Sequence, residues 1–312
     1  MTEAPSGEQY ELTAGGYQAV VVEVGGGIRS LRHGDRDVLQ PYPVNAMCDA
    51  AHGAPLIPWP NRLGDGRYSF DGVEYQLALT EPEKHNAIHG LLRWRSWDLL
   101  ERAADHVAVG TRLHPMQGYP FTLDVRIDYR LSEHGLVVRT TATNAGTEDC
   151  PYGCGQHPYL SPGDADIDSC SLEFGAATRI LTSPDRQLPT GTEQVAGTSY
   201  DFSRLRQVGD LHIDYAFTDL ERDGDGRSWV RLHAPDGMTA QLWVDAGYPL
   251  VELFTADTLS DDRRRRGLGV EPMTCPPNAF QTGERVLRLR PGQSASTEWG
   301  VQLVAGQGST NR

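Results

Sequence analysis

The sequence predicts an all-β protein, built as a large antiparallel β-sandwich. Segments in which apolar and polar residues alternate, or in which β-branched residues dominate, recur along the 312-residue chain. The 34 glycines and 20 prolines are spread evenly, as expected for many strands joined by turns. No long stretch repeats its apolar residues every 3.6 positions, so we expect only a few short helical turns, for example near residues 203–205.

Two hairpins support the antiparallel assignment. Residues 122–131 and 136–144 alternate on either side of a short polar loop that ends in glycine. Residues 229–234 and 239–244 flank a Pro-Asp-Gly turn in the same way. Further strands are predicted at residues 19–24, 106–113, 250–255 and 284–290.

The length and composition favour one folded domain. Hydrophobic residues make up 38% of the chain and charged residues 22%, within the range of a globular protein. No repeat or low-complexity linker interrupts the strand pattern, so we predict a single domain over residues 8–305. The polar ends, residues 1–7 and 306–312, are expected to be frayed.

The net charge of −14 argues against nucleic acid or an anionic membrane as a partner. The basic run Arg263–Arg266 follows two aspartates, and we interpret it as a solvated loop, with an anion-binding site as the alternative. No apolar stretch approaches the ~20 residues that span a bilayer. Residues 1–10 lack a basic start and an apolar core, so a cytoplasmic location is expected.

Cysteine and histidine spacing gives no metal or disulfide signature. The five cysteines are odd in number and scattered, which indicates reduced and partly buried thiols. His85 and His89 are four residues apart, but their segment has no helical pattern that would place them on one face. We therefore expect neither a metal nor another cofactor.

Polar groups instead gather in five segments between predicted strands. In residues 57–63, Trp59 offers a surface for stacking on a sugar ring and Arg62 a fork of donors for hydroxyls. The alternative is a packed turn with a surface arginine. Residues 87–92 contain His89, which is either a site residue or a core histidine bonded to the backbone, and residues 212–217 contain Asp214 beside aromatic residues.

The other two segments offer acid–base groups. Pro158 restricts His157 to an extended conformation, and an imidazole with an ordinary pKa near ~6.5 suits proton transfer at neutral pH. Glu271 stands alone in the apolar, proline-rich residues 267–279. Burial there would raise the pKa of its carboxyl toward that of a useful base.

Taken in series, these segments resemble the aldose 1-epimerase (mutarotase) family over about residues 15–303. The resemblance is carried by Asn61-Arg62, His89-Gly90, His157-Pro158-Tyr159, Asp214 with Phe217, Glu271, and the strand 249–255 that precedes the glutamate.

The resemblance implies a galactose mutarotase-like supersandwich with an open sugar cleft. It also implies roles for site residues: Glu271 as general base, His157 as general acid, Arg62 and His89 as orienting groups, and Asp214 as acceptor of sugar hydroxyls. Asn61 and Tyr159 of the same motifs are expected to contact the sugar. The predicted protein is thus an isomerase that opens and closes a hexose ring without a cofactor, as a monomer or homodimer.

Three alternatives stay open from the sequence. The segment 93–95 differs from plain galactose enzymes, and Asn278 replaces an aspartate found in many members, so the sugar is not specified. Arginines could bind a 6-phospho or 6-sulfo hexose. Asp214 and Glu271 could be the carboxylate pair of a glycoside hydrolase. A non-catalytic carbohydrate-binding module would need only Trp59, Arg62 and Asp214. The arginines considered for the anionic sugar are Arg62, Arg93, Arg95 and Arg263–Arg266.

Overall fold

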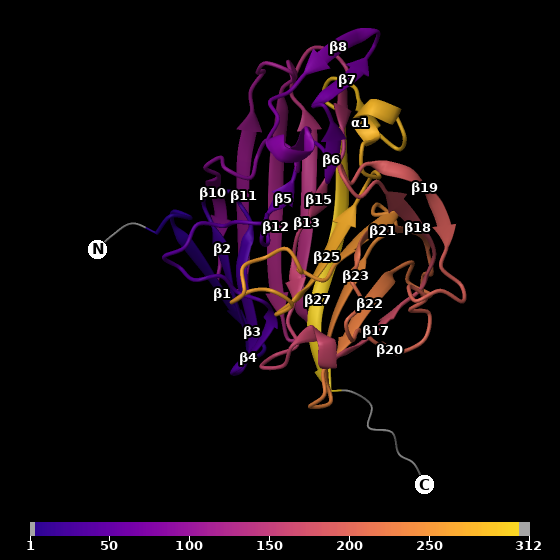
Figure 1. Cartoon of the computed structure of the whole chain (residues 1–312). Helices are drawn as coiled ribbons and strands as arrows, with labels where there is room; N and C mark the ends of the chain where they lie inside the picture. The colour runs from indigo at the N-terminus through magenta and orange to yellow at the C-terminus, as the bar shows by residue number, and fades with distance from the viewer. Residues whose placement is uncertain (1–3, 306–312) are drawn as a thin grey trace.

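The structure, a computed structural model, describes residues 4–305 and is almost entirely β (Figure 1). Two large sheets and three two-stranded ribbons account for its strands, and every pairing between named strands is antiparallel. The prediction of an all-β antiparallel fold is confirmed. Within the described residues, no helix has the length and apolar content needed to cross a bilayer.

The larger sheet has the functional segments near its middle. Its strands follow the order β1 (Gln9–Ala14), β2 (Tyr17–Val22), β3 (Ile28–His33), β4 (Arg36–Leu39), β16 (Tyr159–Leu160), β25 (Leu268–Met273), β24 (Leu250–Phe254), β21 (Asp214–Leu220), β18 (Ala176–Thr182) and β19 (Pro189–Gln194), with the short β15 (Gly155–Gln156) paired to both β25 and β5 (Pro55–Leu56).

The second sheet is built mainly from hairpins. Its order is β10 (Asp98–Arg102), β11 (His106–Leu113), β12 (Leu123–Ser132), β13 (Gly135–Asn144), β27 (Ser294–Ala305), β23 (Met238–Val244), β22 (Ser228–His233), β17 (Ser171–Phe174) and β20 (Arg206–Gln207).

Smaller elements cover the ends of the sheets. The ribbons pair β14 (Cys150–Tyr152) with β26 (Leu287–Leu289), β6 (Arg62–Gly64) with β9 (Asn86–Ile88), and β7 (Arg67–Phe70) with β8 (Val73–Gln76). The helical elements are the 3₁₀ turns Pro82–Lys84 and Ile167–Ser169 and the single-turn helix α1 (Ala279–Thr282), which lies near β6 and β7 (Figure 1).

The two large sheets pack face to face around one extensive apolar core. Phe174 of β17 meets Phe217 of β21 edge-on, with ring centroids 5.7 Å apart. At another contact between the sheets, the Tyr17 hydroxyl of β2 accepts the Leu303 N–H of β27 at 3.0 Å. Most buried apolar residues of both sheets form one large cluster, so the sandwich is held mainly by apolar burial.

Both predicted hairpins are confirmed, because their alternation is a local property of the sequence. β12 and β13 pair along their whole length around a tight turn, and β22 pairs with β23 around residues 235–237. The thiols are free, and Cys48 alone among the five is not fully buried.

Three expectations need correction. Residues 203–205 form no helical turn, because the Asp201 carboxylate accepts bonds from the Ser203 N–H and hydroxyl and turns the chain toward β20. Of the N-terminal segment expected to fray, residues 4–7 form a turn in which Ser6 is buried and accepts the Val24 N–H. The remainder of both ends, residues 1–3 and 306–312, lies outside the described residues.

The basic run is the third correction, since it is not simply a solvated loop. Arg265 is 9% exposed, and its guanidinium bonds Asp257, Asp168 and the carbonyl of Gly209. Arg263 bonds the Asp49 carboxylate. These arginines find acidic partners from segments distant in the sequence, so they tie the β24–β25 connection to the body of the molecule.

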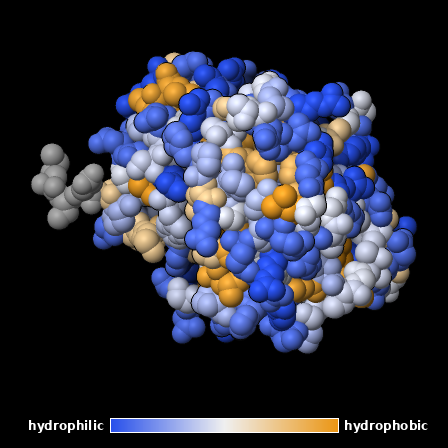
Figure 2. Space-filling model, turned by 90° about the horizontal axis from the view of Figure 1, so that it is seen from above, coloured by the Kyte–Doolittle hydropathy of each residue, from blue (hydrophilic) through white to orange (hydrophobic). Residues whose placement is uncertain are grey.

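The face seen in Figure 2 is mostly hydrophilic, with several separate apolar patches rather than one continuous apolar area. This pattern agrees with the acidic composition and with scattered exposed hydrophobic side chains.

Candidate functional site

A cavity of about 500 Å³ opens above the middle of the larger sheet. That volume lies in the usual range for small-molecule sites. The side chains around it come from segments far apart in the sequence. Its lining comprises Ala50, Asn61, Arg62, Thr80, Glu81, Glu83, Lys84, Ile88, His89, Arg93, His157, Tyr159, Gln187, Asp214, Phe254, Thr258, Leu259 and Glu271.

All seven residues predicted for the site line this one cavity. A second, smaller cavity of about 280 Å³ is lined by Trp59, Leu77, Leu91 and other side chains that do not titrate. The larger cavity is therefore the candidate for chemistry.

His157 and Glu271 face each other because of strand register. Gly155 lies opposite Met273, and Tyr159 lies opposite Gly269, in the pairings of β15 and β16 with β25. The residues midway along these two stretches are His157 and Glu271. Their Nε2 and Oε1 atoms are 3.2 Å apart, and both side chains are about 95% buried. The sheet itself thus assembles an acid–base pair.

Burial controls the protonation of this pair. It raises the pKa of the Glu271 carboxyl well above its ordinary value, and the nearby Asp214 charge adds to the effect. Burial also lowers the pKa of His157, to about 3. The rise for Glu271 was predicted, but the ordinary pKa expected for His157 was wrong, because its fixed conformation also removes the ring from water. Both shifts favour the neutral pair, with the proton on the Glu271 carboxyl, over the ion pair.

The ring of His157 is held by a stack of aromatic rings. Tyr159 stacks on His157 with centroids 5.0 Å apart, and His52 stacks on the other face of Tyr159 at 4.5 Å. Arg263 bonds Nδ1 of His52 at 2.9 Å. The Tyr159 hydroxyl is used within the protein, since it donates to the Ala50 carbonyl. Tyr159 thus orients His157 and presents only part of its surface to the cavity.

The tautomer of His89 is fixed by the backbone. The Asn61 N–H donates to Nδ1 of His89 at 3.2 Å, and the His89 N–H donates to the Asn61 carbonyl at 3.0 Å. Both residues have a positive φ, so this reciprocal pair defines the local turn. Burial, then Arg93, hold the pKa of His89 well below its ordinary value. The neutral ring must therefore carry its hydrogen on Nε2, ready to donate.

Arg62 is a buried, paired cation rather than a surface arginine. Its Nε and Nη2 donate to the Glu81 carboxylate at 2.9 and 3.0 Å. Burial opposes the charge on Arg62, but the bonds to Glu81 outweigh it and raise the guanidinium pKa. The same pair lowers the pKa of Glu81 against the opposing effect of burial. Arg62 consequently stays charged and rigid beside the cavity.

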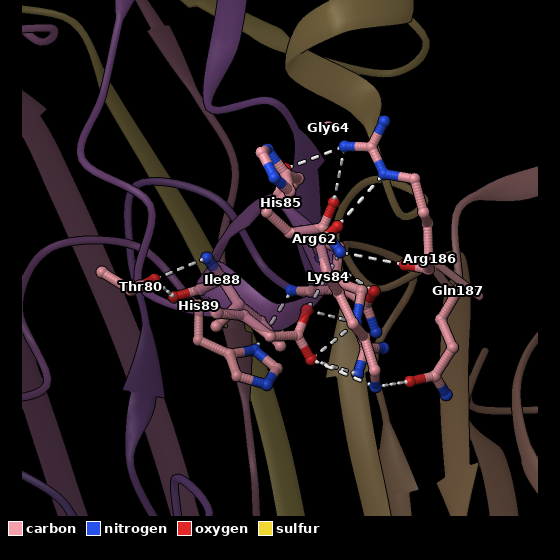
Figure 3. A network of polar contacts seen from close by, with 12 residues as sticks. Arg62, Gly64, Thr80, Lys84, His85, Ile88, His89, Arg186 and Gln187 are labelled. Atoms are coloured by element: carbon pink, nitrogen blue, oxygen red, sulfur yellow. Dashed lines mark hydrogen bonds and ion pairs between the residues drawn. The ribbon is translucent and has the colours of Figure 1, made fainter.

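A relay of polar side chains leads from Glu81 to Asp214. Lys84 Nζ lies 3.3 Å from Glu81 and donates to the Gln187 side-chain oxygen (Figure 3). The Gln187 amide in turn donates to Asp214. Asp214 thereby receives a fixed donor and keeps its other surface toward the cavity.

Trp59 is not available to stack on a sugar. It is 2% exposed and packs against Phe280 of α1, with centroids 5.6 Å apart. The packed-turn interpretation is right for Trp59, while the surface position that it assigned to Arg62 is wrong.

His89, His157 and Glu271 place donor atoms within 4.8 Å of one another, a spacing that could accommodate a small cation. The Arg62 charge lies close to the same groups, as its effects on their pKa values show, and it would oppose a dication. We therefore assign no metal to these residues, and the expectation of a cofactor-free site stays a prediction.

Comparison with known proteins decides the family. The family model described as aldose 1-epimerase matches residues 8–301. The chain belongs to the aldose 1-epimerase family.

Relatives of known sequence support that assignment. The uncharacterized protein YihR of Escherichia coli K12 is 34% identical over 289 residues, which is 92% of this chain and 91% of YihR. The aldose 1-epimerase of the same organism is 25% identical over 283 residues, with 81% and 80% of the two chains covered.

Solved structures of the family share the fold. A Caenorhabditis elegans GalM/aldose epimerase homologue superposes with a TM-score of 0.85 at 18% identity, covering 96% of this chain and 99% of the other. A putative aldose 1-epimerase from Escherichia coli K12 gives 0.81 at 21% identity, covering 96% and 99%. The predicted galactose mutarotase-like sandwich is confirmed.

For this epimerase-family chain, sequence reasoning missed several polar residues of the site region, four of which bear on its chemistry. Glu81, Lys84 and Gln187 form the relay beside the cavity, and Glu252 lies buried on β24 across from Glu271. Glu252 alone had a readable signal, because it is the single charged residue in an otherwise apolar strand. The others lie in loops whose sequence gives no indication of where they fold.

The arginines considered for an anionic sugar differ in their position relative to the cavity and in their ion pairing. Arg93 lines the cavity, whereas the exposed Arg95 lies outside its lining. Arg263, Arg265 and Arg266 are already paired with aspartates. Within residues 4–305, Arg93 forms no ion pair, and its only protein hydrogen bond runs to the Ile88 carbonyl at 3.3 Å.

Proposed function

We propose that this protein is an aldose 1-epimerase that interconverts the α and β anomers of a hexose. The observation that carries the proposal is the buried His157–Glu271 pair, 3.2 Å apart, at the edge of a cavity with room for a sugar. In the proposal this pair exchanges one proton, which is what a reversible ring opening needs.

In the proposed reaction, Glu271 removes the proton of the C1 hydroxyl while His157 protonates the ring oxygen. The C1–O bond of the ring breaks as the C1 hydroxyl becomes an aldehyde. Rotation about C1–C2 exposes the other face of the carbonyl, and the roles reverse on closure. Proton exchange across the 3.2 Å contact supplies the required form, carboxylate with imidazolium, from the neutral pair. Each positioned group contributes ~10²–10⁴-fold, enough for a reaction that already proceeds uncatalysed.

The surrounding groups fit the orientation of a polyhydroxylated ring. Neutral His89 presents an Nε2–H donor, Arg62 presents a positive charge that Glu81 holds at the cavity wall, and Asp214 presents an acceptor. Asn61 supports His89 through its backbone, and Tyr159 supports His157 through ring stacking.

A second candidate within this reaction is an anionic hexose, phosphorylated or sulfonated at C6. It is favoured by Arg93, a largely buried cation at the cavity wall without an acidic partner in the described chain. Burial lowers the pKa of this guanidinium, so an anionic ligand would relieve the cost of keeping it charged.

An NMR exchange screen tests the reaction and its substrate. Glucose, galactose, their 6-phosphates and a 6-sulfonated hexose are compared for the rate of anomer exchange. Glu271→Gln and His157→Asn are expected to lose at least ~10²-fold in exchange rate on the best sugar while remaining folded. Exchange by both variants at near-normal rates would rule out the assigned pair.

The same screen tests Arg93. Arg93→Met should lower kcat/KM by about tenfold or more for an anionic hexose and much less for a neutral one, because only the former loses a charge contact. Equal losses on both sugars would remove the anionic candidate. Release of reducing sugar from aryl glycosides would instead indicate a hydrolase, and saturable sugar binding without faster exchange a binding module.

A further inference from the structure

Glu252 is a buried carboxyl that takes no part in the proposed proton transfers. It lies opposite Glu271 of β25 and opposite Ala216 of β21, so its side chain is on the same face of the sheet as both. Its side chain does not line the cavity, and the residue is 3% exposed. Its Oε2 atom has no hydrogen-bond partner in the described chain. A buried carboxyl with an unused oxygen requires an explanation.

The surroundings of Glu252 do not support a charge. Ile180, Ala216, Leu250 and Met273 form a small apolar cluster on this face, contributed by β18, β21, β24 and β25. The cation close enough to act on Glu252 is Arg62, whose Nε and Nη2 are bonded to Glu81. The other titratable groups that face it are the carboxyls of Asp214 and Glu271.

The register of β21 and β24 puts Asp214 and Glu252 at diagonal positions on one face of the sheet, and Asp214 is among the causes that raise the pKa of Glu252. A direct bond between the two carboxyl groups requires a proton on one of them, because an ionised carboxylate can only accept. Asp214 is less buried than Glu252 and accepts a hydrogen bond from the Gln187 amide. Burial, followed by the charges of Asp214 and Glu271, raises the pKa of Glu252 well above its ordinary value. The proton therefore belongs on Glu252.

We propose that Glu252 is a positioning residue that stands as a neutral carboxylic acid and donates its O–H to the Asp214 carboxylate. The inference rests on the proposed function, in which Asp214 binds the sugar. With Glu252 neutral, one fixed carboxylate lies beside the Glu271–His157 pair, rather than two mutually repelling charges next to the base. Asp214 is then held from both sides, by Gln187 and by Glu252.

Two variants of similar size distinguish a hydrogen bond donated by residue 252 from the mere filling of space by its side chain. Glu252→Gln keeps a neutral donor toward Asp214, whereas Glu252→Met keeps the length and loses the donor. We expect the Met variant to raise KM by about tenfold with a smaller change in kcat, because a hydrogen bond to a charged group is lost. The Gln variant should restore KM to within about threefold of the parent. A Met variant with parental KM would overturn the proposal.

The pH profile reads the charge on Glu252 directly. If Glu252 is neutral, Glu252→Gln leaves the alkaline limb of kcat/KM within about half a pH unit of the parent. If Glu252 is ionised, the same change removes an anion beside Glu271 and moves that limb down by about one unit or more, which overturns the proposal.

Carboxyl ¹³C NMR of the parent protein provides a test that needs no turnover. The resonance that disappears in Glu252→Gln should keep the chemical shift of a protonated acid from pH 5 to 8. The shift of an ionised carboxylate at neutral pH overturns the proposal. This measurement stands even if the parent accelerates no anomer exchange, so the failure of the proposed function and the failure of this inference remain distinguishable.

Discussion

The protein has two clusters that contain carboxyl groups, each on neighbouring antiparallel strands, and the carboxyl pKa values shift in opposite directions in the two. The first, the carboxyl floor, comprises Asp214, Glu252 and Glu271 on β21, β24 and β25. The second, the outer cluster, comprises Glu101, His106, Arg126 and Asp128 on β10, β11 and β12.

Asp128 of the outer cluster and Glu271 of the carboxyl floor are both buried, but their partners differ. Asp128 is 8% exposed and Glu271 is 3% exposed. Arg126 donates twice to Asp128, at 2.7 and 2.8 Å, and lowers its pKa to about 2 despite the effect of burial. Glu271 has no such cation and its pKa is raised. A carboxyl in a strand becomes a fixed anion or a proton-exchanging group according to whether a guanidinium is dedicated to it.

The largest expected difference between the clusters concerns activity. Glu81→Gln weakens the bonds that hold Arg62 in place beside the cavity, and kcat/KM for the best sugar should fall by about 10–100-fold. The matched change Glu101→Gln weakens an arginine contact in the outer cluster and should leave kcat/KM within about twofold. Similar losses in the two variants would show that the comparison does not extend to function.

The pH dependence of kcat/KM gives the next contrast. The His157–Glu271 pair keeps one proton from about pH 3, where His157 takes up a second proton, to the raised pKa at which Glu271 loses its proton. Activity should therefore change less than about tenfold between pH 6 and 8. Ordinary pKa values would instead give about a 30-fold loss by pH 8, since the acid would deprotonate near ~6.5. A loss of that size would contradict the assigned protonation.

The smallest expected effects are on thermal stability, and they should have opposite signs when Glu271 and Asp128 are replaced by their amides. The raised pKa of Glu271 means that its stabilising contribution is present below about pH 4.5 and is lost as the pH rises through the folded-state pKa. Glu271→Gln should accordingly raise Tm at pH 7 by about 3–6 °C.

Asp128 should show the reverse. Its pKa is lowered, so its contribution is present above about pH 3.8 and is lost as the pH falls toward 2. Asp128→Asn should lower Tm at pH 7 by about 1–3 °C, with unchanged activity. Differential scanning calorimetry of both variants at pH 7 and pH 4 checks the two signs, and shifts in the same direction would refute the contrast.

Sequence reasoning was strongest where the information is local. The β12–β13 hairpin follows from alternation on both sides of a glycine turn, and the isolation of Glu271 in apolar residues correctly indicated burial. The facing of His157 and Glu271 could not be derived in this way, because it depends on the register of strands more than 100 residues apart. The family resemblance supplied that pairing instead.

The errors have physical reasons of the same kind. The stacking role considered for Trp59 is not available, because Phe280, more than 200 residues later, covers its ring. Arg265 reads as solvated, yet Asp168 and Asp257 enclose it. Gln187 gives no signal at all, since a loop glutamine becomes a site residue only through the path of the chain.

The place of β25 in the larger sheet has a consequence for biosynthesis. This strand occupies an interior position, between β16 and β24, although it is made among the last. In a nascent chain that has emerged only as far as β24, β16 can pair with β4 but not with β25, so His157 lacks Glu271 and the strand on its other side. Active protein can form only near the end of translation, after a slow closure between distant segments. The rate at which activity recovers during refolding would therefore measure how fast β25 inserts into the larger sheet.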